Sequence, residues 1–239
     1  MENFNTDTRQ SIYFGVSYVI ASEWSADAMK RLDFQRALAE RQLDLPQTSV
    51  GARDFTLIRT EQSALQVKVA SLGPSVSSIS INADRPVHTL DLFGREAEAV
   101  CDAYCQIWLK QQRQILQSNA RIRHLYSCQG HAFKYLWEER LGQKPDDFRY
   151  LGKRPVLGGG LRLFMPPLKQ DEEPVQIEIK IESFLREPKK MFIETIFVWP
   201  KPLPQAEDAN FAPELRLKSV EKYATREVCD FILQTKTEQ

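Results

Sequence analysis

The sequence lacks the features that would assign it to several large functional classes. Its 32 Lys and Arg residues are matched by 32 Asp and Glu residues, so no net charge favours nucleic acid or an anionic membrane. No apolar run approaches the roughly 20 residues that span a bilayer, and the N-terminus has no basic segment followed by an apolar one. We therefore expect a soluble protein of the cytoplasm, with no membrane partner.

Catalytic signatures are missing as well. The chain has no Gly-x-Ser-x-Gly motif, no phosphate-binding Walker loop and no dinucleotide Gly-x-Gly-x-x-Gly motif. Its three histidines have no evident Ser or Cys partner in the sequence. The sequence favours a protein without catalytic residues or a cofactor, although it leaves an enzyme open.

Cysteine is scarce, with four residues in the chain. Cys101 and Cys105 stand one helical turn apart, and Cys128 with His131 forms a Cys-x-x-His pair, so a Cys₃His zinc site is conceivable. The first pair lies inside an expected helix, however, whereas zinc knuckles place their cysteines on turns. We therefore predict reduced, buried thiols and no metal site.

Hydrophobic periodicity divides the chain into strands and helices that occur in the same order twice. We expect Ser25 to begin the first helix, with Met29 and Leu32 on its inner face and Leu38 as a further candidate there, and Asp91 to begin the second. The first series is a strand at 12–20, a helix at 25–43, strands at 55–60, 65–72 and 76–82, and a helix from 91. The second series is a strand at 121–128, a helix at 131–141, strands at 161–165, 175–184 and 191–199, and a helix at 213–235.

Two local echoes support a duplication. Leu65-Gln66-Val67-Lys68-Val69 is matched by Val175-Gln176-Ile177-Glu178-Ile179, and Val100-Cys101-Asp102 by Val228-Cys229-Asp230. We predict an α+β protein of two pseudo-equivalent β-α-β-β-β-α halves, residues 1–118 and 119–239, which could form one joint domain. Each half would have a mostly antiparallel sheet with helices on one face. The two sheets could stack, or join edge to edge.

The chain resembles a sporadically distributed prokaryotic family of unknown function. The resemblance rests on the strand at 12–20, the hairpin 65–82, the strand Arg121 to Tyr126 and the helix around 222–231. In the family, the middle strand resembles an Ile-Gly-Leu-Arg-Tyr-Ile-Asn pattern. This chain departs from it twice, with His124 before the Leu and without the usual Arg before Tyr126. The resemblance implies a tandem arrangement of α+β halves and supplies no activity, cofactor or site residue.

The most basic part of the chain lies between Lys110 and Arg154. Arg121 and Arg123 alternate along one strand, so their side chains share a face. A glycine run follows Lys153 and Arg154, and its backbone amides could cradle a phosphate, although the run leads into a strand and not a helix. The residues of this speculative binding site are Arg121, Arg123, His124, Lys153, Arg154, Gly158, Gly159 and Gly160.

Two functional hypotheses follow. The leading one is a non-catalytic protein that acts through a protein partner or self-association, with the seam between the halves as its binding surface. The alternative is a tandem ferredoxin-like protein of the CRISPR type that binds or processes RNA, with His124 as general acid or base and Lys153 and Arg154 holding phosphates.

Overall fold

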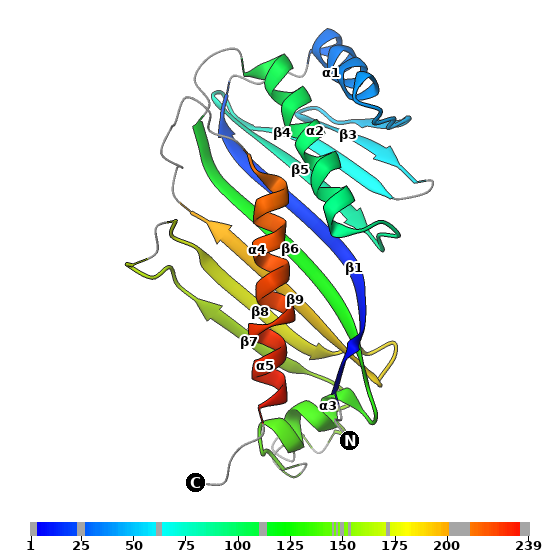
Figure 1. Cartoon of the computed structure of the whole chain (residues 1–239), viewed down its shortest axis with the longest axis vertical. Helices are drawn as coiled ribbons and strands as arrows, with labels where there is room; N and C mark the ends of the chain where they lie inside the picture. The colour runs from blue at the N-terminus through cyan, green and yellow to red at the C-terminus, as the bar shows by residue number, and fades with distance from the viewer. Residues whose placement is uncertain are drawn as a thin grey trace.

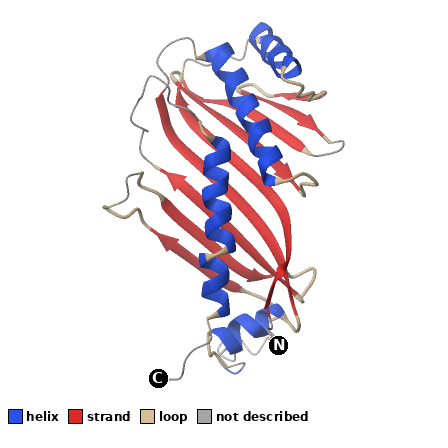
Figure 2. Ribbon diagram, in the orientation of Figure 1, coloured by secondary structure: helices blue, strands red, loops and turns tan. Residues whose placement is uncertain are grey.

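The structure is a computed structural model. It describes residues 4–22, 27–60, 64–109, 114–144, 146, 148, 151–152, 154–170, 173–200 and 211–234. A nine-stranded sheet, antiparallel between all neighbours, forms its centre, and the helices lie along one face of it (Figures 1 and 2). The predicted α+β class, with antiparallel strands and helices on one side, is confirmed.

Two long strands occupy the middle of the sheet. β1 and β6 pair with each other, and the remaining strands extend outward from them on both sides. Across the sheet the strands are β2 (Gln47–Val50), β3 (Asp54–Arg59), β4 (Leu65–Gly73), β5 (Val76–Asp84), β1 (Phe4–Ala21), β6 (Gln114–Cys128), β9 (Lys190–Trp199), β8 (Gln176–Ser183) and β7 (Gly160–Met165). β6 runs through the 118/119 boundary, so the strands before and after that boundary share one sheet, joined edge to edge.

The helices form a single layer over this sheet. α2 and α4 pack against each other, and Figure 1 shows α5 continuing α4 along the far strands while α1 lies at the opposite end. A Cβ on Gly94 of α2 would lie 3.0 Å from the Cβ of Glu214 in α4, so glycine permits this close approach. The helices are α1 (Ala28–Glu40), α2 (Leu90–Trp108), α3 (Ala132–Lys134) with the π-helical turn η1 (Tyr135–Arg140), α4 (Pro213–Thr225) and α5 (Glu227–Leu233).

The alternation of apolar residues along the strands builds the core. In β4, Leu65, Val67 and Val69 are buried beneath the helices, whereas Gln66 and Lys68 between them are exposed on the other side. Two clusters result, one chiefly under α1, α2 and α4 and the other under α3, η1 and α5. Each helix therefore covers apolar area that a single sheet face could not bury alone.

Several local predictions were wrong. Met29 and Leu32 are 64% and 50% exposed, and α1 buries Phe34 and Ala37 together with Leu38, the one inner-face candidate that the structure bears out. The first turn of α2 is capped by Thr89, whose hydroxyl accepts the Leu92 N–H, and Asp91 lies inside the helix.

Other differences concern element bounds. Strand β2 was not predicted, β1 and β6 begin earlier than expected, and the last helix is interrupted at Arg226. The predicted cap Ser25 lies outside the described residues. Long strands gain residues from pairing with distant neighbours, which the sequence pattern does not contain.

Candidate functional site

The side of the sheet opposite the helices is here called the open face. The described helices all lie on the other side (Figure 2). Strand register places Tyr13, Arg123, Glu194 and Lys180 next to one another on the open face, on β1, β6, β9 and β8. The middle of the open face therefore carries a row of charges.

Glu194 is the centre of this row and is only 2% exposed. Its carboxylate lies 2.5 Å from Arg123 Nε, 2.7 Å from Lys180 Nζ and 3.8 Å from Arg121 Nε. Burial by itself would raise the pKa of Glu194, but the hydrogen bonds from Lys180 and Arg123 outweigh it and lower that pKa. Glu194 is thus a buried carboxylate, held ionised by the surrounding cations.

The row continues to the edge of the sheet. Lys180 lies 3.7 Å from Glu178, which is 2.8 Å from Arg162 on β7. On the other side, the Arg123 guanidinium stacks 4.5 Å above the Tyr13 ring, and the Tyr13 hydroxyl donates to Asn82 Oδ1 at 2.7 Å. Arg121 and Arg123, two of the cations that the sequence suggested for a binding site, are therefore already engaged with protein groups.

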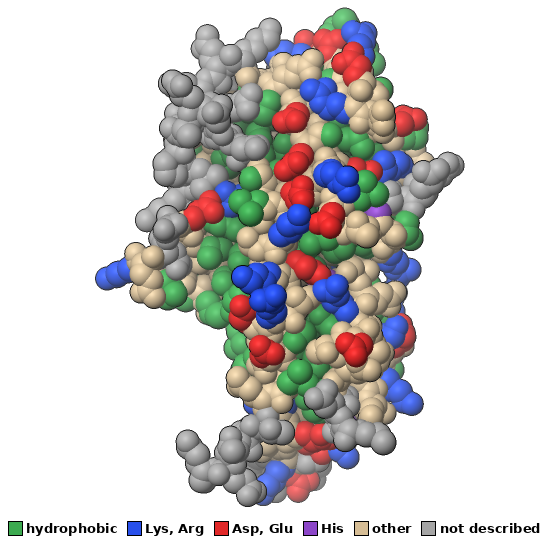
Figure 3. Space-filling model, viewed as in Figure 1, with side chains coloured by type: hydrophobic (Ala, Val, Ile, Leu, Met, Phe, Trp, Pro, Cys, Tyr) green, Lys and Arg blue, Asp and Glu red, His purple; other side chains and the backbone are tan. Residues whose placement is uncertain are grey.

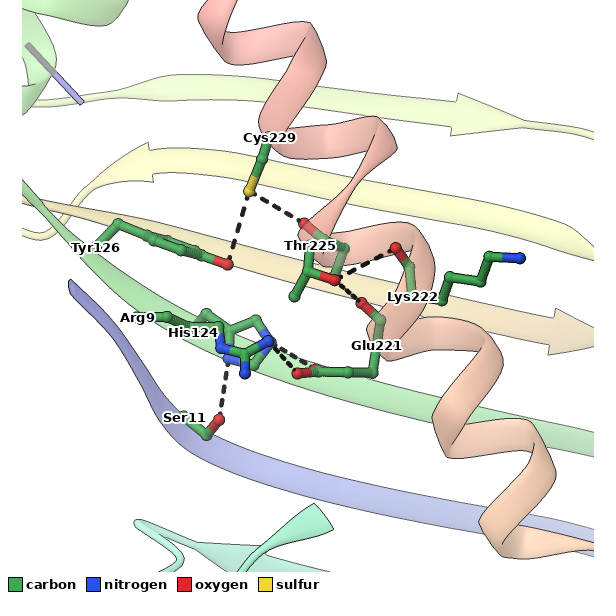
Figure 4. A network of polar contacts seen from close by, with 9 residues as sticks. Arg9, Ser11, His124, Tyr126, Glu221, Lys222, Thr225 and Cys229 are labelled. Atoms are coloured by element: carbon green, nitrogen blue, oxygen red, sulfur yellow. Dashed lines mark hydrogen bonds and ion pairs between the residues drawn. The ribbon is translucent and has the colours of Figure 1, made fainter. Parts of the chain in front are cut away.

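His124 lies on the opposite side of the same strand, beneath α4. Its Nε2 is 2.8 Å from Glu221 Oε2 of α4, and its Nδ1 is 3.2 Å from Ser11 Oγ of β1 (Figure 4). Arg9 pairs with the same carboxylate at 2.5 Å. Burial tends to raise the pKa of Glu221, yet the His124 hydrogen bond and the charges of His124 and Arg9 lower it overall.

Ser11, His124 and Glu221 have the composition of a nucleophile–base–acid triad. The imidazole has no exposed surface, however, because β1, β6 and α4 enclose it. A leaving group therefore has no route to the His124 ring, and a general acid must reach the leaving group in order to protonate it. The arrangement is suited to holding α4 on the two central strands through satisfied buried polar contacts.

A neighbouring thiol extends these contacts. Cys229 of α5 donates to the Tyr126 hydroxyl at 3.7 Å (Figure 4), and the centroid of the Tyr126 ring lies 5.9 Å from that of the His124 ring. Burial raises the pKa of the Cys229 thiol and also that of Tyr126. Both groups therefore remain neutral, and Cys229 has little thiolate to act as a nucleophile.

The glycine run lies elsewhere, at the start of β7. The Gly159 N–H donates to Ser183 Oγ at 3.2 Å, so this amide is already occupied. A Cβ on Gly160 would lie 2.0 Å from the Ile181 carbonyl oxygen, which shows why that position is glycine. Arg154 lines a separate cavity of about 640 Å³ with Phe133 and Trp137, whereas Lys153 lies outside the described residues.

The structure thus separates the predicted site residues into three places. Arg121 and Arg123 are on the open face, His124 is under α4, and Arg154 with the glycine run lies at the far end of the sheet, beyond β9 and β8. Sequence reasoning missed Ser11, Glu194 and Glu221. No local motif marks them, because each contacts a residue at least 71 positions away.

A groove lies where the open face meets two loops. It has a volume of about 840 Å³ and lies between residues 84–87 and residues 184–190, over the lower halves of β1, β6 and β9. Arg85 and Arg186 stand on its two sides, both exposed, and neither makes an ion pair within the described part of the chain. Its apolar lining consists of Ile12, Pro86, Val87, Leu125, Phe184 and Phe192.

Among the described residues, no cluster of His, Cys, Asp and Glu could hold a metal ion, and Cys101 and Cys128 lie in different core clusters. None of the described helices has the length and hydropathy to cross a membrane. Comparison with protein-family models finds no match, and comparison with curated proteins finds no significant one.

Proposed function

We propose that this protein is a non-catalytic binding protein of the cytoplasm that takes a segment of a partner protein into the groove of the open face. The observation that carries the proposal is an apolar lining flanked by two guanidinium groups, Arg85 and Arg186, that have no ion pair within the described part of the chain and stand on opposite sides. Apolar surface provides the favourable free energy of binding, and charges at the margin select the partner.

The partner segment should be acidic with apolar anchors. Within the groove, Lys190 pairs with Glu187 at 3.0 Å and Arg123 pairs with Glu194, so these cations are already neutralised. Asp84 is the remaining carboxylate of the lining, beside Arg85. A peptide with Asp or Glu on both sides of a Leu or Phe would meet the free guanidinium groups and fill the apolar floor.

Charge placement favours a protein over RNA. Binding a nucleic acid backbone requires a track of cations that are free to neutralise successive phosphates. On the open face, Arg121, Arg123 and Lys180 surround Glu194, and Arg162 is paired with Glu178. On the helix face, Lys and Arg side chains are interspersed with Asp and Glu (Figure 3).

We also propose that the chain consists of two pseudo-equivalent halves joined at β1 and β6. The sheet order supports this, because β5 and β4 follow β1 outward as β9 and β8 follow β6. The echoed segments Leu65–Val69 and Val175–Ile179 fall on β4 and at the start of β8, at corresponding places. β2 has no counterpart among the described strands, so the halves differ at their outer ends.

The test is fluorescence anisotropy with a labelled peptide in which Asp and Glu flank Leu and Phe. The comparison probes are the same peptide with Lys in place of its acidic residues, and a single-stranded RNA of about 20 nucleotides. The protein variant is Arg85→Glu with Arg186→Glu. The control is Arg95→Glu with Lys222→Glu, which changes the charge equally on exposed positions of α2 and α4.

We expect the wild type and the control to bind the acidic peptide and the groove variant to lose at least about tenfold in affinity, as for two charge-assisted contacts. The lysine peptide should not bind. Equal binding of both peptides, or equal loss in groove variant and control, would overturn the groove assignment. Tighter binding of RNA than of the acidic peptide would replace the proposal with the nucleic-acid hypothesis.

A further inference from the structure

β7 forms one edge of the sheet. It pairs with β8, and no other described strand lies beside it (Figure 1). The opposite edge, β2, has four residues of which three are polar, whereas β7 reads Gly-Leu-Arg-Leu-Phe-Met. Long apolar edge strands pair readily with further strands, so proteins usually shorten, charge or cover them.

The free backbone groups of β7 belong to alternate residues. The Gly159 carbonyl accepts the Ser183 N–H at 3.0 Å, which directs the backbone groups of that residue toward β8. Backbone groups in an antiparallel strand alternate in direction, so Leu161, Leu163 and Met165 also bond β8. The N–H and C=O groups of Gly160, Arg162 and Phe164 therefore point outward from the sheet.

The side chains at this edge are apolar on both faces. Leu161, Leu163 and Met165 are half-buried at the margin of the core under α5, and Phe164 is 59% exposed on the open face. Arg162 is the charged residue of the strand, and its charge is engaged by Glu178. Within the described part of the chain, the edge thus offers unpaired hydrogen-bonding groups and uncovered apolar surface together.

We propose that β7 pairs with β7 of a second copy of this chain, antiparallel, about a twofold axis at Leu163. The nine-stranded sheet would then continue without interruption into that of the partner. Such a contact is isologous, because the same strand serves both subunits, and it closes at two copies. This surface is separate from the groove of the open face.

The sequence of β7 is self-complementary in this register. Arg162 lies opposite the partner's Phe164, where a guanidinium can stack on the ring, and both residues present outward backbone groups for a hydrogen-bonded pair. Leu161 lies opposite the partner's Met165 on the helix side.

Neighbouring registers are less favourable. An axis at Arg162 would place two like charges directly opposite each other. An axis at Phe164 would set Arg162 opposite the partner's Pro166, which has no N–H to donate and no aromatic ring for the guanidinium to stack on. With the axis at Leu163, Pro166 lies opposite Gly160, at the end of the strand pair. The register at Leu163 is therefore the one that pairs Arg162 with Phe164 through both side chains and backbone.

The first experiment measures association by sedimentation over a concentration series up to about 1 mM. High concentrations are needed because one strand pair buries less than the roughly 1,200–2,000 Å² of a typical stable interface, so we expect the dimer to be weak. Arg162→Pro removes an outward N–H and no bond to β8, and Phe164→Arg places like charges opposite each other. Val50→Arg, at a residue 55% exposed on the opposite edge, is the matched control.

We expect a dimer for the wild type and the control, and a dissociation constant at least about tenfold larger for both β7 variants. Circular dichroism and thermal unfolding should show that all variants fold. A monomeric wild type across the whole series would overturn the proposal, as would a control that weakens association as much as the β7 variants do.

The second experiment tests the register. The pair formed by Leu163 and the partner's Leu163 is not hydrogen-bonded, which brings the Cα atoms to about 4.5 Å and permits a disulfide. Leu163→Cys should crosslink under mild oxidation, because the native cysteines are buried. Leu161→Cys, whose symmetry mate would be about 13 Å away, should not. Equal crosslinking of both variants, or none in Leu163→Cys, would overturn this register.

Discussion

His124 Nε2 and Glu221 Oε2 lie 2.8 Å apart, joining the central strand β6 to α4 across the helix–sheet interface. Ser11 on one side of the imidazole and Arg9 on the carboxylate satisfy the remaining polar atoms (Figure 4). A buried polar contact of this kind fixes where a helix sits along a sheet, which apolar packing specifies less sharply.

Removal of the carboxylate should therefore destabilise the fold. Glu221→Ala leaves the buried His124 nitrogen and Arg9 without a partner, and we expect a loss of about 2–3 kcal/mol in the free energy of unfolding. Urea denaturation followed by circular dichroism measures the change. Glu227→Ala, at an exposed position of α5, is the control and should cost less than about 1 kcal/mol. Equal losses in the free energy of unfolding of the two variants would show that the buried contact contributes no more to stability than the exposed carboxylate does.

The open-face carboxylate should govern stability in acid. The pKa of Glu194 is lowered in the folded state, so its contribution is present above the unfolded value near 4.3 and is lost as pH falls through the folded pKa. Glu194→Gln should be less stable at neutral pH and show a flatter decline below about pH 4.5. Glu182→Gln, exposed on the same face, should retain the wild-type profile.

His88, which lies apart from His124, should make stability depend on pH near neutrality. Burial lowers the pKa of His88, although the neighbouring Glu96 acts in the opposite direction. The unfolded state then binds more protons than the folded state, so stability should fall as pH decreases through about 6.5. His88→Gln should reduce this slope in thermal unfolding between about pH 7 and 5. His131→Gln controls for the loss of an exposed imidazole, and an unchanged slope in His88→Gln would contradict the assignment.

Two glycines should respond differently to substitution by alanine. A Cβ at Gly160 would lie 2.0 Å from the Ile181 carbonyl oxygen, and backbone atoms cannot yield cheaply, so Gly160→Ala should cost about 1–3 kcal/mol. Gly130→Ala meets nothing within 4 Å and should change stability by less than about 0.5 kcal/mol. Chemical denaturation of both variants makes the comparison, and a neutral Gly160→Ala would show that β7 and β8 can separate at this point.

Much of the secondary structure could be predicted because its signal is local. The alternation of Leu65, Val67 and Val69 indicates a half-buried strand, and the apolar face of residues 93–108 indicates a helix, as the structure has them. The inner face of α1 could be predicted only in part. Leu38 is buried as expected, but Met29 and Leu32 compete with Phe34 and Ala37, and only the position of α2 and the sheet decides which are buried.

Less of the candidate site could be predicted from the sequence. Arg121 and Arg123 were correctly placed on one face by alternation, but the carboxylate that engages them, Glu194, lies in a strand 71 residues beyond Arg123. His124 was noticed without its partners, since Ser11 and Glu221 are 113 and 97 residues away. No spacing rule connects residues that meet through strand order.

By itself, the sequence determined most of the strand and helix segments and the alternation of strand residues between core and surface, because these follow from backbone periodicity and the burial of apolar side chains. Only the tertiary structure decided that β1 and β6 join the strands into one sheet, that Glu194 forms ion pairs with Arg121 and Arg123, and that β7 lies at an edge of the sheet. Those outcomes depend on long-range pairing, whose free energy is shared between residues that are remote in the chain.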